Sequence, residues 1–238
     1  MSAPSGEDDR RRREAVVHGC REIGRRGLSG GTSGNVGIRR DGHGFFVSPT
    51  GMAYETLLPD EVPLVTFDGR WYGPCRPSSE WRFHRDILMA RPEVGAIVHT
   101  HSPMATALAS TGRGIPAFHY MVAVAGGADI RCAPYHIFGS QELSHAALDA
   151  LRGRRACLLA NHGVITLGTN LDAALSLAAE VEDLALKYCT ALGIGDVRIL
   201  SGAEMERVME KFRSYGSQSA VDPELEFGGL PLPARGAS

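Results

Sequence analysis

Two histidines stand at the end of an apolar segment, at a spacing that lets them share one metal ion. The segment Val94-Gly-Ala-Ile-Val-His99-Thr-His101 has the apolar run that is typical of a buried strand. Because side chains in a strand alternate between two faces, His99 and His101 point to the same side. The pair alone also fits ordinary polar residues at a strand end, so a third ligand is needed.

A third histidine follows a second apolar segment. Residues 156–160 are apolar and lead into Asn161-His162-Gly163, where the glycine allows a tight reversal into residues 164–167. His162 therefore also stands at a strand end. Three neutral imidazoles with an open fourth position are the ligand set of a catalytic divalent metal, most often zinc, which polarises a carbonyl group or activates water. The sequence predicts such a site on His99, His101 and His162.

Glu80 is the carboxylate that we expect beside this metal. It lies in Pro77-Ser-Ser-Glu80-Trp-Arg-Phe-His84, in the first turn of a helix predicted over residues 80–90 with Ser79 as its N-cap. The helix dipole stabilises a negative charge at that position. The same residues would also serve simply to begin a helix, but alongside three histidines Glu80 is the candidate base and a candidate fourth metal ligand in the free enzyme.

Two glycine-rich turns offer hydroxyls and backbone N–H groups to an anion. They are Gly30-Gly-Thr-Ser-Gly-Asn35 and Ser48-Pro-Thr-Gly51, and neither matches a P-loop or a dinucleotide fingerprint. Alone they are ordinary turns. Together with Ser78 and Ser79 at a helix N-terminus, they would form a cradle for a phosphate group.

Lysine is scarce. Of the 25 lysines and arginines, only Lys187 and Lys211 are lysines, and both fall in helix-like segments toward the C-terminus. Schiff-base chemistry therefore has few candidate residues.

The pattern of apolar residues predicts the elements that position these groups. Helices are expected over residues 9–26, 80–90, 102–110, 141–151, 171–192 and 203–212, and strands over residues 36–39, 44–48, 62–67, 94–100, 156–160 and 164–167. This mixture predicts an α/β or α+β sandwich in which helices cover a largely antiparallel sheet. Residues 1–216 are expected to form one domain, and residues 217–238 a flexible tail.

Composition excludes several classes of protein. Hydrophobic residues make up 43% and charged residues 22% of the 238, and no run approaches the roughly 18 apolar residues of a membrane helix. The net charge of −2 gives no general attraction to nucleic acid or an anionic membrane, although residues 10–13 are all arginine. The N-terminus lacks the apolar core of a secretory signal, and the five cysteines form no C-x-x-C pair, so we expect a cytoplasmic protein with reduced thiols.

These residues resemble the class II aldolase/adducin family, and within it most closely the L-fuculose-1-phosphate aldolases. The similarity extends from about Leu28 to Gly216. The motifs that carry it are Gly-Thr-Ser-Gly-Asn35, Ser-Pro-Thr-Gly51, Pro-Ser-Ser-Glu-Trp-Arg-Phe-His84, His-Thr-His101, His-Tyr120, Ala-Gly-Gly127, Cys-Ala-Pro-Tyr135, Phe-Gly139, Asn-His-Gly163 and Tyr215-Gly216. The chain departs from the fuculose enzymes at Asn161, which stands where they have a glutamine.

The resemblance implies a three-layer α/β/α sandwich assembled as a homotetramer, with one zinc per subunit in a cleft between subunits. Glu80 matches the catalytic carboxylate of the family, and Tyr120 and Tyr215 match tyrosines of an adjacent subunit that handle the aldehyde and its proton. The segments that match the family's phosphate-binding site contribute Thr32, Ser33, Gly34, Asn35, Thr50, Gly51, Ser78 and Ser79.

The activity that the resemblance implies is the reversible cleavage of a ketose 1-phosphate. A substrate of the L-fuculose 1-phosphate type would give dihydroxyacetone phosphate and an aldehyde such as L-lactaldehyde. Zinc would take the place of a Schiff-base lysine in stabilising the enediolate, and Glu80 would remove the C3 proton in the direction of synthesis. The expected partner is thus a phosphorylated sugar, with no nucleic acid and no membrane.

Three other functions fit many of the same residues. L-ribulose-5-phosphate 4-epimerases share the fold, the metal ligands and retro-aldol chemistry, but use aspartate at the position of Glu80. Methylthioribulose-1-phosphate dehydratases keep the glutamate and the three histidines. A non-catalytic interaction module like the head of adducin keeps the fold without metal chemistry, and the intact histidines and Glu80 argue against it.

Overall fold

The computed structural model describes residues 6–213, and these residues form a sheet with helices on both faces. The strands are β1 (Asn35–Arg40), β2 (Gly44–Val47), β3 (Leu64–Thr66), β4 (Trp71–Tyr72), β5 (Ala96–Thr100), β6 (Arg131–Ala133), β7 (Ala156–Leu159) and β8 (Gly163–Gly168). The α-helices are α1 (Gly6–Arg25), α2 (Trp81–Ala90), α3 (Pro103–Ala109), α4 (Gln141–Ala150), α5 (Leu171–Ile194) and α6 (Gly202–Phe212). Two short 3-10 helices are η1 (Pro59–Glu61) and η2 (Tyr120–Ala125).

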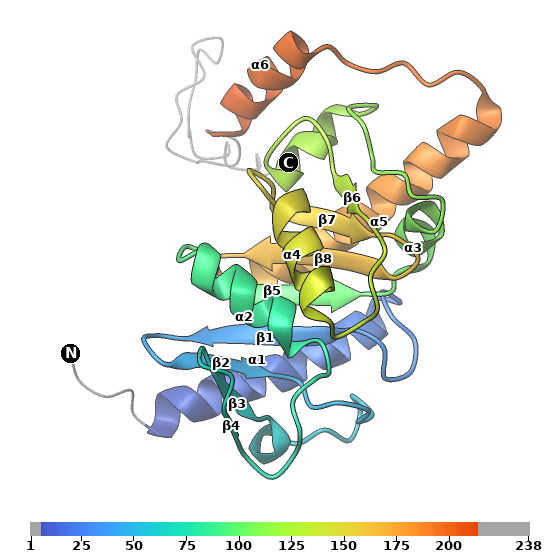
Figure 1. Cartoon of the computed structure of the whole chain (residues 1–238). Helices are drawn as coiled ribbons and strands as arrows, with labels where there is room; N and C mark the ends of the chain where they lie inside the picture. The colour runs from blue at the N-terminus through green and yellow to red at the C-terminus, as the bar shows by residue number, and fades with distance from the viewer. Residues whose placement is uncertain (1–5, 214–238) are drawn as a thin grey trace, which may run out of the picture.

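The strands form one sheet in the order β4-β3-β2-β1-β5-β8-β7-β6 (Figure 1). Neighbouring strands are antiparallel throughout, except that β6 and β7 are parallel. The prediction of a largely antiparallel sheet is therefore confirmed. In this order β5 lies between a meander formed by β1 to β4 and the C-terminal strands β8, β7 and β6.

Helices cover both faces of the sheet, with one core cluster on one face and two on the other. α2 and α4 lie on one face, while α1, α3 and α5 lie on the other (Figure 1). Along β5, Ile97 belongs to the α2/α4 core and its neighbours Ala96 and Val98 belong to a core cluster on the opposite face. Each fully buried isoleucine or valine contributes on the order of 1.5–3 kcal/mol. The arrangement is the predicted three-layer α/β/α sandwich.

The predicted elements agree with the structure wherever the apolar pattern is long. Strands β4 and β6 and the helices η1 and η2 were not predicted. At the start of α2 the predicted N-cap is wrong. Glu80 occupies the cap position without a capping side chain, and the Ser78 hydroxyl accepts a hydrogen bond from the Glu80 backbone N–H at 3.2 Å.

The basic run near the N-terminus pairs within the chain. Arg10 and Arg11 form ion pairs with Glu14 and Glu7 along α1, and Arg12 pairs with Asp41. Arg13 donates to the backbone carbonyl of Val62 at 2.6 Å.

No helix among residues 6–213 is long and apolar enough to cross a membrane. The predicted tail over residues 217–238 lies outside the described residues.

Candidate metal centre and active site

Four predicted residues converge at one end of the sheet. Glu80, His99, His101 and His162 each offer a ligand atom, and these atoms all lie within 4.8 Å of one another. The three imidazole rings are 4.9–5.0 Å apart between centroids and nearly perpendicular in pairs. The Glu80 carboxylate reaches two of them, with its oxygens 3.1 Å from His99 Nε2 and 3.2 Å from His162 Nε2.

Strand pairing explains why histidines that are 63 residues apart in sequence meet (162 − 99 = 63). β5 and β8 are antiparallel, so the end of β5 lies beside the start of β8, and His99 is paired with Ile165. His162 precedes β8 in the turn from β7. In that turn the left-handed residue is Asn161, with φ 55°, and not the glycine that the sequence suggested.

Gly163 is needed for a different reason, which is close packing. A Cβ atom at this position would lie 2.3 Å from the backbone oxygen of Thr100 and 2.9 Å from the ring of His101. Only a residue without a side chain lets β8 approach the end of β5 this closely. The glycine therefore sets the distance between the strands that carry the histidines.

Neighbouring groups fix how two of the histidines are presented. His99 Nδ1 lies 2.8 Å from the backbone carbonyl of Val164, an acceptor, so the ring proton sits on Nδ1 and Nε2 faces the cluster with its lone pair. The hydroxyl of Ser29 accepts a hydrogen bond of 2.6 Å from the His101 backbone N–H.

The protonation states of His101, His162 and Glu80 favour the binding of a cation. Burial lowers the pKa of both His101 and His162 to about 4, so their rings are neutral at physiological pH. Burial alone would raise the pKa of Glu80, but His99, His162 and the Asn35 amide outweigh it and lower the pKa to about 2. Glu80 Oε1 is buried and accepts no hydrogen bond. Imidazoles gathered around a buried carboxylate fit a divalent metal ion.

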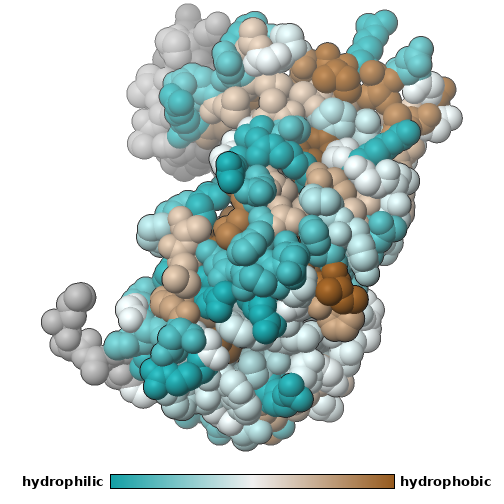
Figure 2. Space-filling model, viewed as in Figure 1, coloured by the Kyte–Doolittle hydropathy of each residue, from teal (hydrophilic) through white to brown (hydrophobic). Residues whose placement is uncertain are grey.

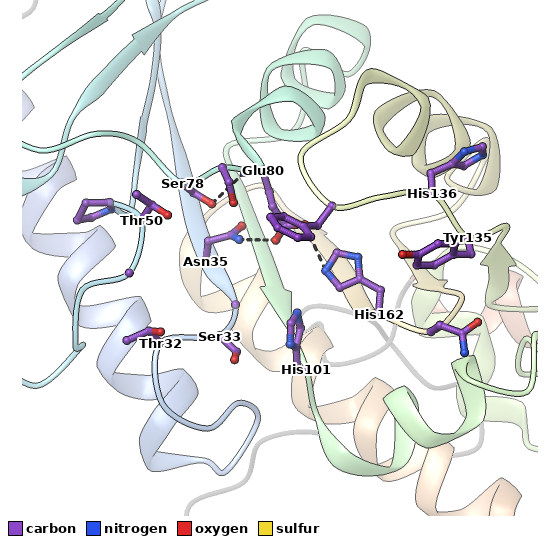
Figure 3. A pocket seen from close by; sticks show the side chains of 16 residues that line it. Thr32, Ser33, Asn35, Thr50, Ser78, Glu80, His101, Tyr135, His136 and His162 are labelled. Atoms are coloured by element: carbon purple, nitrogen blue, oxygen red, sulfur yellow. Dashed lines mark hydrogen bonds and ion pairs between the residues drawn. The ribbon is translucent and has the colours of Figure 1, made fainter.

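A cavity of about 530 Å³ opens beside this cluster. All eight residues of the predicted phosphate-binding segments line it, together with Glu80, His101 and His162. Figure 3 shows Thr32, Ser33, Thr50 and Ser78 on one side of Glu80 and the histidines, with Tyr135 and His136 on the other. Neither lysine lines the cavity, since Lys187 pairs with Asp183 on α5 and Lys211 lies in α6.

The sequence interpretation missed the second wall of the cavity. Tyr135, His136 and Phe138 line it from the segment between β6 and α4, and Asn161 lines it from the turn before β8. Tyr135 and Phe138 are 56% and 61% exposed, and large exposed aromatic residues beside a cavity are a common mark of a binding surface. Tyr135 and Phe138 belong to motifs named above. In a short irregular segment, however, sequence periodicity does not show which way an aromatic side chain points.

Of the two predicted tyrosines, Tyr120 does not line this cavity. Tyr120 lies in η2, is 50% exposed, and stacks on His119 and Phe212. It lines a smaller cavity with Val208 and Lys211. Tyr215 lies outside the described residues.

The fold and the site together define a class of protein, namely an α/β/α protein in which a cluster of histidines and a glutamate that could hold a metal ion lies beside a hydroxyl-lined cavity. The family model described as the class II aldolase and adducin N-terminal domain matches residues 14–189. The chain belongs to this family, and it is a class II, metal-dependent aldolase.

Relatives of known name agree with this assignment. The chain is 51% identical to a 5-methylthioribulose-1-phosphate/5-deoxyribulose-1-phosphate aldolase of Rhodospirillum rubrum, over 88% of this chain and 94% of the relative. It is 45% identical to the L-fuculose phosphate aldolase of Escherichia coli K12, over 84% and 94%. Among solved structures, an L-fuculose 1-phosphate aldolase matches with a TM-score of 0.83 at 34% identity, covering 88% of this chain and 98% of that one.

Proposed function

We propose that the chain cleaves the C3–C4 bond of a ketose 1-phosphate, releasing dihydroxyacetone phosphate and a short aldehyde. One observation carries this proposal. Of the cluster of Glu80, His99, His101 and His162, all but the buried His99 line the same cavity as the hydroxyl and glycine residues expected to bind a phosphate. An anion site and a metal site within one cavity suit a small substrate with a phosphate at one end and a carbonyl near it.

Each residue has a role in this proposal. His99, His101 and His162 hold the metal, which we propose to be zinc because imidazole ligands with an open position suit it. A bound divalent cation would polarise the substrate carbonyl and stabilise the negative charge that develops as the carbon–carbon bond breaks. In cleavage a base takes the proton of the C4 hydroxyl as the C3–C4 bond breaks and the aldehyde forms, and Glu80 returns a proton to C3; in synthesis Glu80 removes a proton from C3.

The phosphate end is held without lysine. Backbone N–H groups and hydroxyls of residues 32–35, 50–51 and 78–79 line one side of the cavity, and Ser78 and Ser79 precede the N-terminus of α2. Helix N-termini and glycine-rich turns of this kind bind phosphate through N–H groups and the helix dipole.

For the sugar, we propose 5-deoxyribulose 1-phosphate or its 5-methylthio derivative. The relative at 51% identity is named for these substrates. Cleavage between C3 and C4 would leave acetaldehyde or methylthioacetaldehyde, whose apolar end suits the aromatic wall of Tyr135 and Phe138. L-Fuculose 1-phosphate, which would leave lactaldehyde, is the second candidate, and the relatives and solved structure named for it support that alternative.

We also propose a homotetramer with active sites between subunits. Tyr120 does not line the metal-bearing cavity of its own chain, so a role for it there requires a neighbour. Leu192, Ile194 and Ile199 are exposed at the end where α5 leads into α6, and Figure 2 shows apolar surface gathered over that end. A cytoplasmic location is proposed on the five free thiols.

An assay of dihydroxyacetone phosphate release tests the function. Zinc-loaded protein should release it from 5-deoxyribulose 1-phosphate and its methylthio derivative with a higher kcat/KM than from L-fuculose 1-phosphate. Epimerisation of L-ribulose 5-phosphate, or loss of water from methylthioribulose 1-phosphate without dihydroxyacetone phosphate, would overturn the aldolase proposal. Protein that binds no divalent metal and turns over none of these sugars would instead support an interaction module.

A further inference from the structure

His84 is a fully buried polar residue that the proposed reaction does not use. It lies on α2, four residues after Glu80, and its ring is 0% exposed. The ring packs between Phe45 and Phe83, with centroid distances of 6.2 Å and 4.7 Å. Burial lowers the pKa of His84 to about 3, so the imidazole is neutral. A buried, neutral imidazole in an aromatic slot needs a hydrogen-bond partner to offset its desolvation.

That partner is Asn35, which in turn contacts the candidate base. His84 Nε2 lies 2.5 Å from Asn35 Oδ1, and Asn35 Nδ2 donates to Glu80 Oε2 at 3.0 Å. All three side chains are buried, with Asn35 3% and Glu80 6% exposed. The residues form a chain of two hydrogen bonds that ends on the carboxylate.

The donor and acceptor of each of these two hydrogen bonds follow from which atoms can donate. His84 Nδ1 is buried without a partner, so the ring proton belongs on Nε2, where the Asn35 carbonyl oxygen accepts it. With that oxygen occupied, the Asn35 amide must turn its NH2 group to Glu80. A flipped amide would face its NH2 to the His84 N–H and its oxygen to the Glu80 carboxylate, and would lose both hydrogen bonds.

The backbone of β1 is shaped to admit the ring. Gly37 is two residues after Asn35 and therefore on the same face of the strand. A Cβ atom at Gly37 would lie 2.4 Å from His84 Nδ1 and 3.0 Å from Cε1. The missing side chain leaves the space in which the imidazole reaches Asn35.

We propose that His84 is a positioning residue for the reaction: its Nε2–H fixes the Asn35 amide, which holds the Glu80 carboxylate in place. His84 touches neither the cavity nor the histidine cluster in this arrangement. The kinetic consequence rests on the proposed function, because it assumes that Glu80 moves a proton at C3. The hydrogen-bonded chain itself does not depend on that assumption.

A matched pair of substitutions tests the kinetic consequence. The amide nitrogen of glutamine reaches the position of the imidazole Nε2, whereas that of asparagine reaches only the position of Nδ1. In zinc-loaded protein, His84→Gln should keep kcat within about threefold of the wild type. His84→Asn should lower kcat by about 10–100-fold, as expected if the Asn35 amide, no longer fixed by His84, loses its hydrogen bond to the charged Glu80 carboxylate. KM and metal content should change little in either variant. Equal losses in both variants, or none in His84→Asn, would overturn the proposal.

A second measurement needs neither metal nor substrate. In metal-free protein labelled with 15N-histidine, NMR should show His84 neutral, with its proton on Nε2 and slow to exchange with solvent. Asn35→Asp keeps an acceptor and should preserve that proton, whereas Asn35→Leu should lose it. A proton on Nδ1 in the wild type would contradict the inference. If the NMR result holds but no ketose phosphate is cleaved, the proposed function fails and not the hydrogen-bonded chain.

Discussion

Three residues of the histidine and glutamate cluster are held by groups that lie outside it. Val164 fixes His99 through its carbonyl, Ser29 holds the backbone of His101, and Asn35 holds Glu80. Such outer contacts determine which atom faces a metal and in which protonation state. In the proposed site the three histidines hold the metal, and Glu80 is the residue whose loss should affect turnover more than metal binding.

Replacing Glu80 by glutamine should separate metal binding from turnover. The amide keeps the size of the side chain but has no basic oxygen, so kcat should fall by about 100–10,000-fold while zinc stays bound to the histidines. Metal analysis and release of dihydroxyacetone phosphate measure the two effects. His101→Ala should lose both, and Glu206→Gln, at an exposed position on α6, should change neither. Normal turnover by Glu80→Gln would show that the base is assigned wrongly.

Burial of His84 should make stability depend on pH. Its pKa falls from 6.5 to about 3 on folding, so between these values the unfolded chain binds a proton that the folded protein does not. The free energy of unfolding therefore decreases as pH falls below 6.5, by up to about 1.4 kcal/mol per pH unit for this group. Urea denaturation of metal-free protein from pH 6.5 to 5 should show a steeper decline in the wild type than in His84→Gln. Parallel declines would contradict the assignment.

At the level of single residues, the sequence predicted which residues come together in the cluster better than it predicted their surroundings. Strand periodicity places His99 and His101 on one side, and His162 and Glu80 follow from their positions at element ends. The contact of Asn35 with Glu80 was not predicted, because it joins the start of β1 to the start of α2 and depends on how they pack. The hydrogen bond between His84 and Asn35 was not predicted either, because the motif that contains His84 does not show which residue its side chain contacts.

At the level of elements, the close approach of β5 and β8 is the feature that builds the site. Long apolar periods predicted both strands and the helices around them. Sequence periodicity does not give the distance between two strands, and here that distance depends on the absence of a side chain at Gly163.

Gly163→Ala should therefore weaken the metal site. Its methyl group would collide with the Thr100 oxygen and the His101 ring, forcing the strands apart where the histidines meet. We expect a zinc affinity at least about tenfold lower and a loss of about 1–3 kcal/mol in stability, as is typical of overpacking. Competition with a chelator and urea denaturation measure these changes. Gly193→Ala on α5, where a Cβ atom meets nothing within 4 Å, is the matched control. An unchanged zinc affinity in Gly163→Ala would show that this packing does not set the site.

For the whole molecule, the proposed tetramer can be tested by mixing inactive subunits. If Tyr120 acts in a neighbour's site, Glu80→Gln and Tyr120→Phe subunits that are co-expressed will form some sites with both residues intact. Random assembly in a cyclic tetramer leaves about a quarter of the sites complete, so activity should recover to roughly that fraction. Glu80→Gln mixed with His101→Ala is the control, since both residues belong to one chain's cluster, and it should recover nothing. No recovery in the first mixture would place Tyr120 outside the neighbour's site.

The order of strands in the sheet has a consequence for how the protein is made. β1 to β4 and then β5 leave the ribosome first, but β5 has only β1 as a neighbour until β8 follows more than 60 residues later. Until then the edge of β5 that will pair with β8 is open, and an unpaired apolar edge favours aggregation. His162 precedes β8 directly, so the last histidine arrives together with the strand that closes this edge. Chains that end between residues 101 and 161 should therefore be both unable to form the complete metal site and prone to aggregate during synthesis.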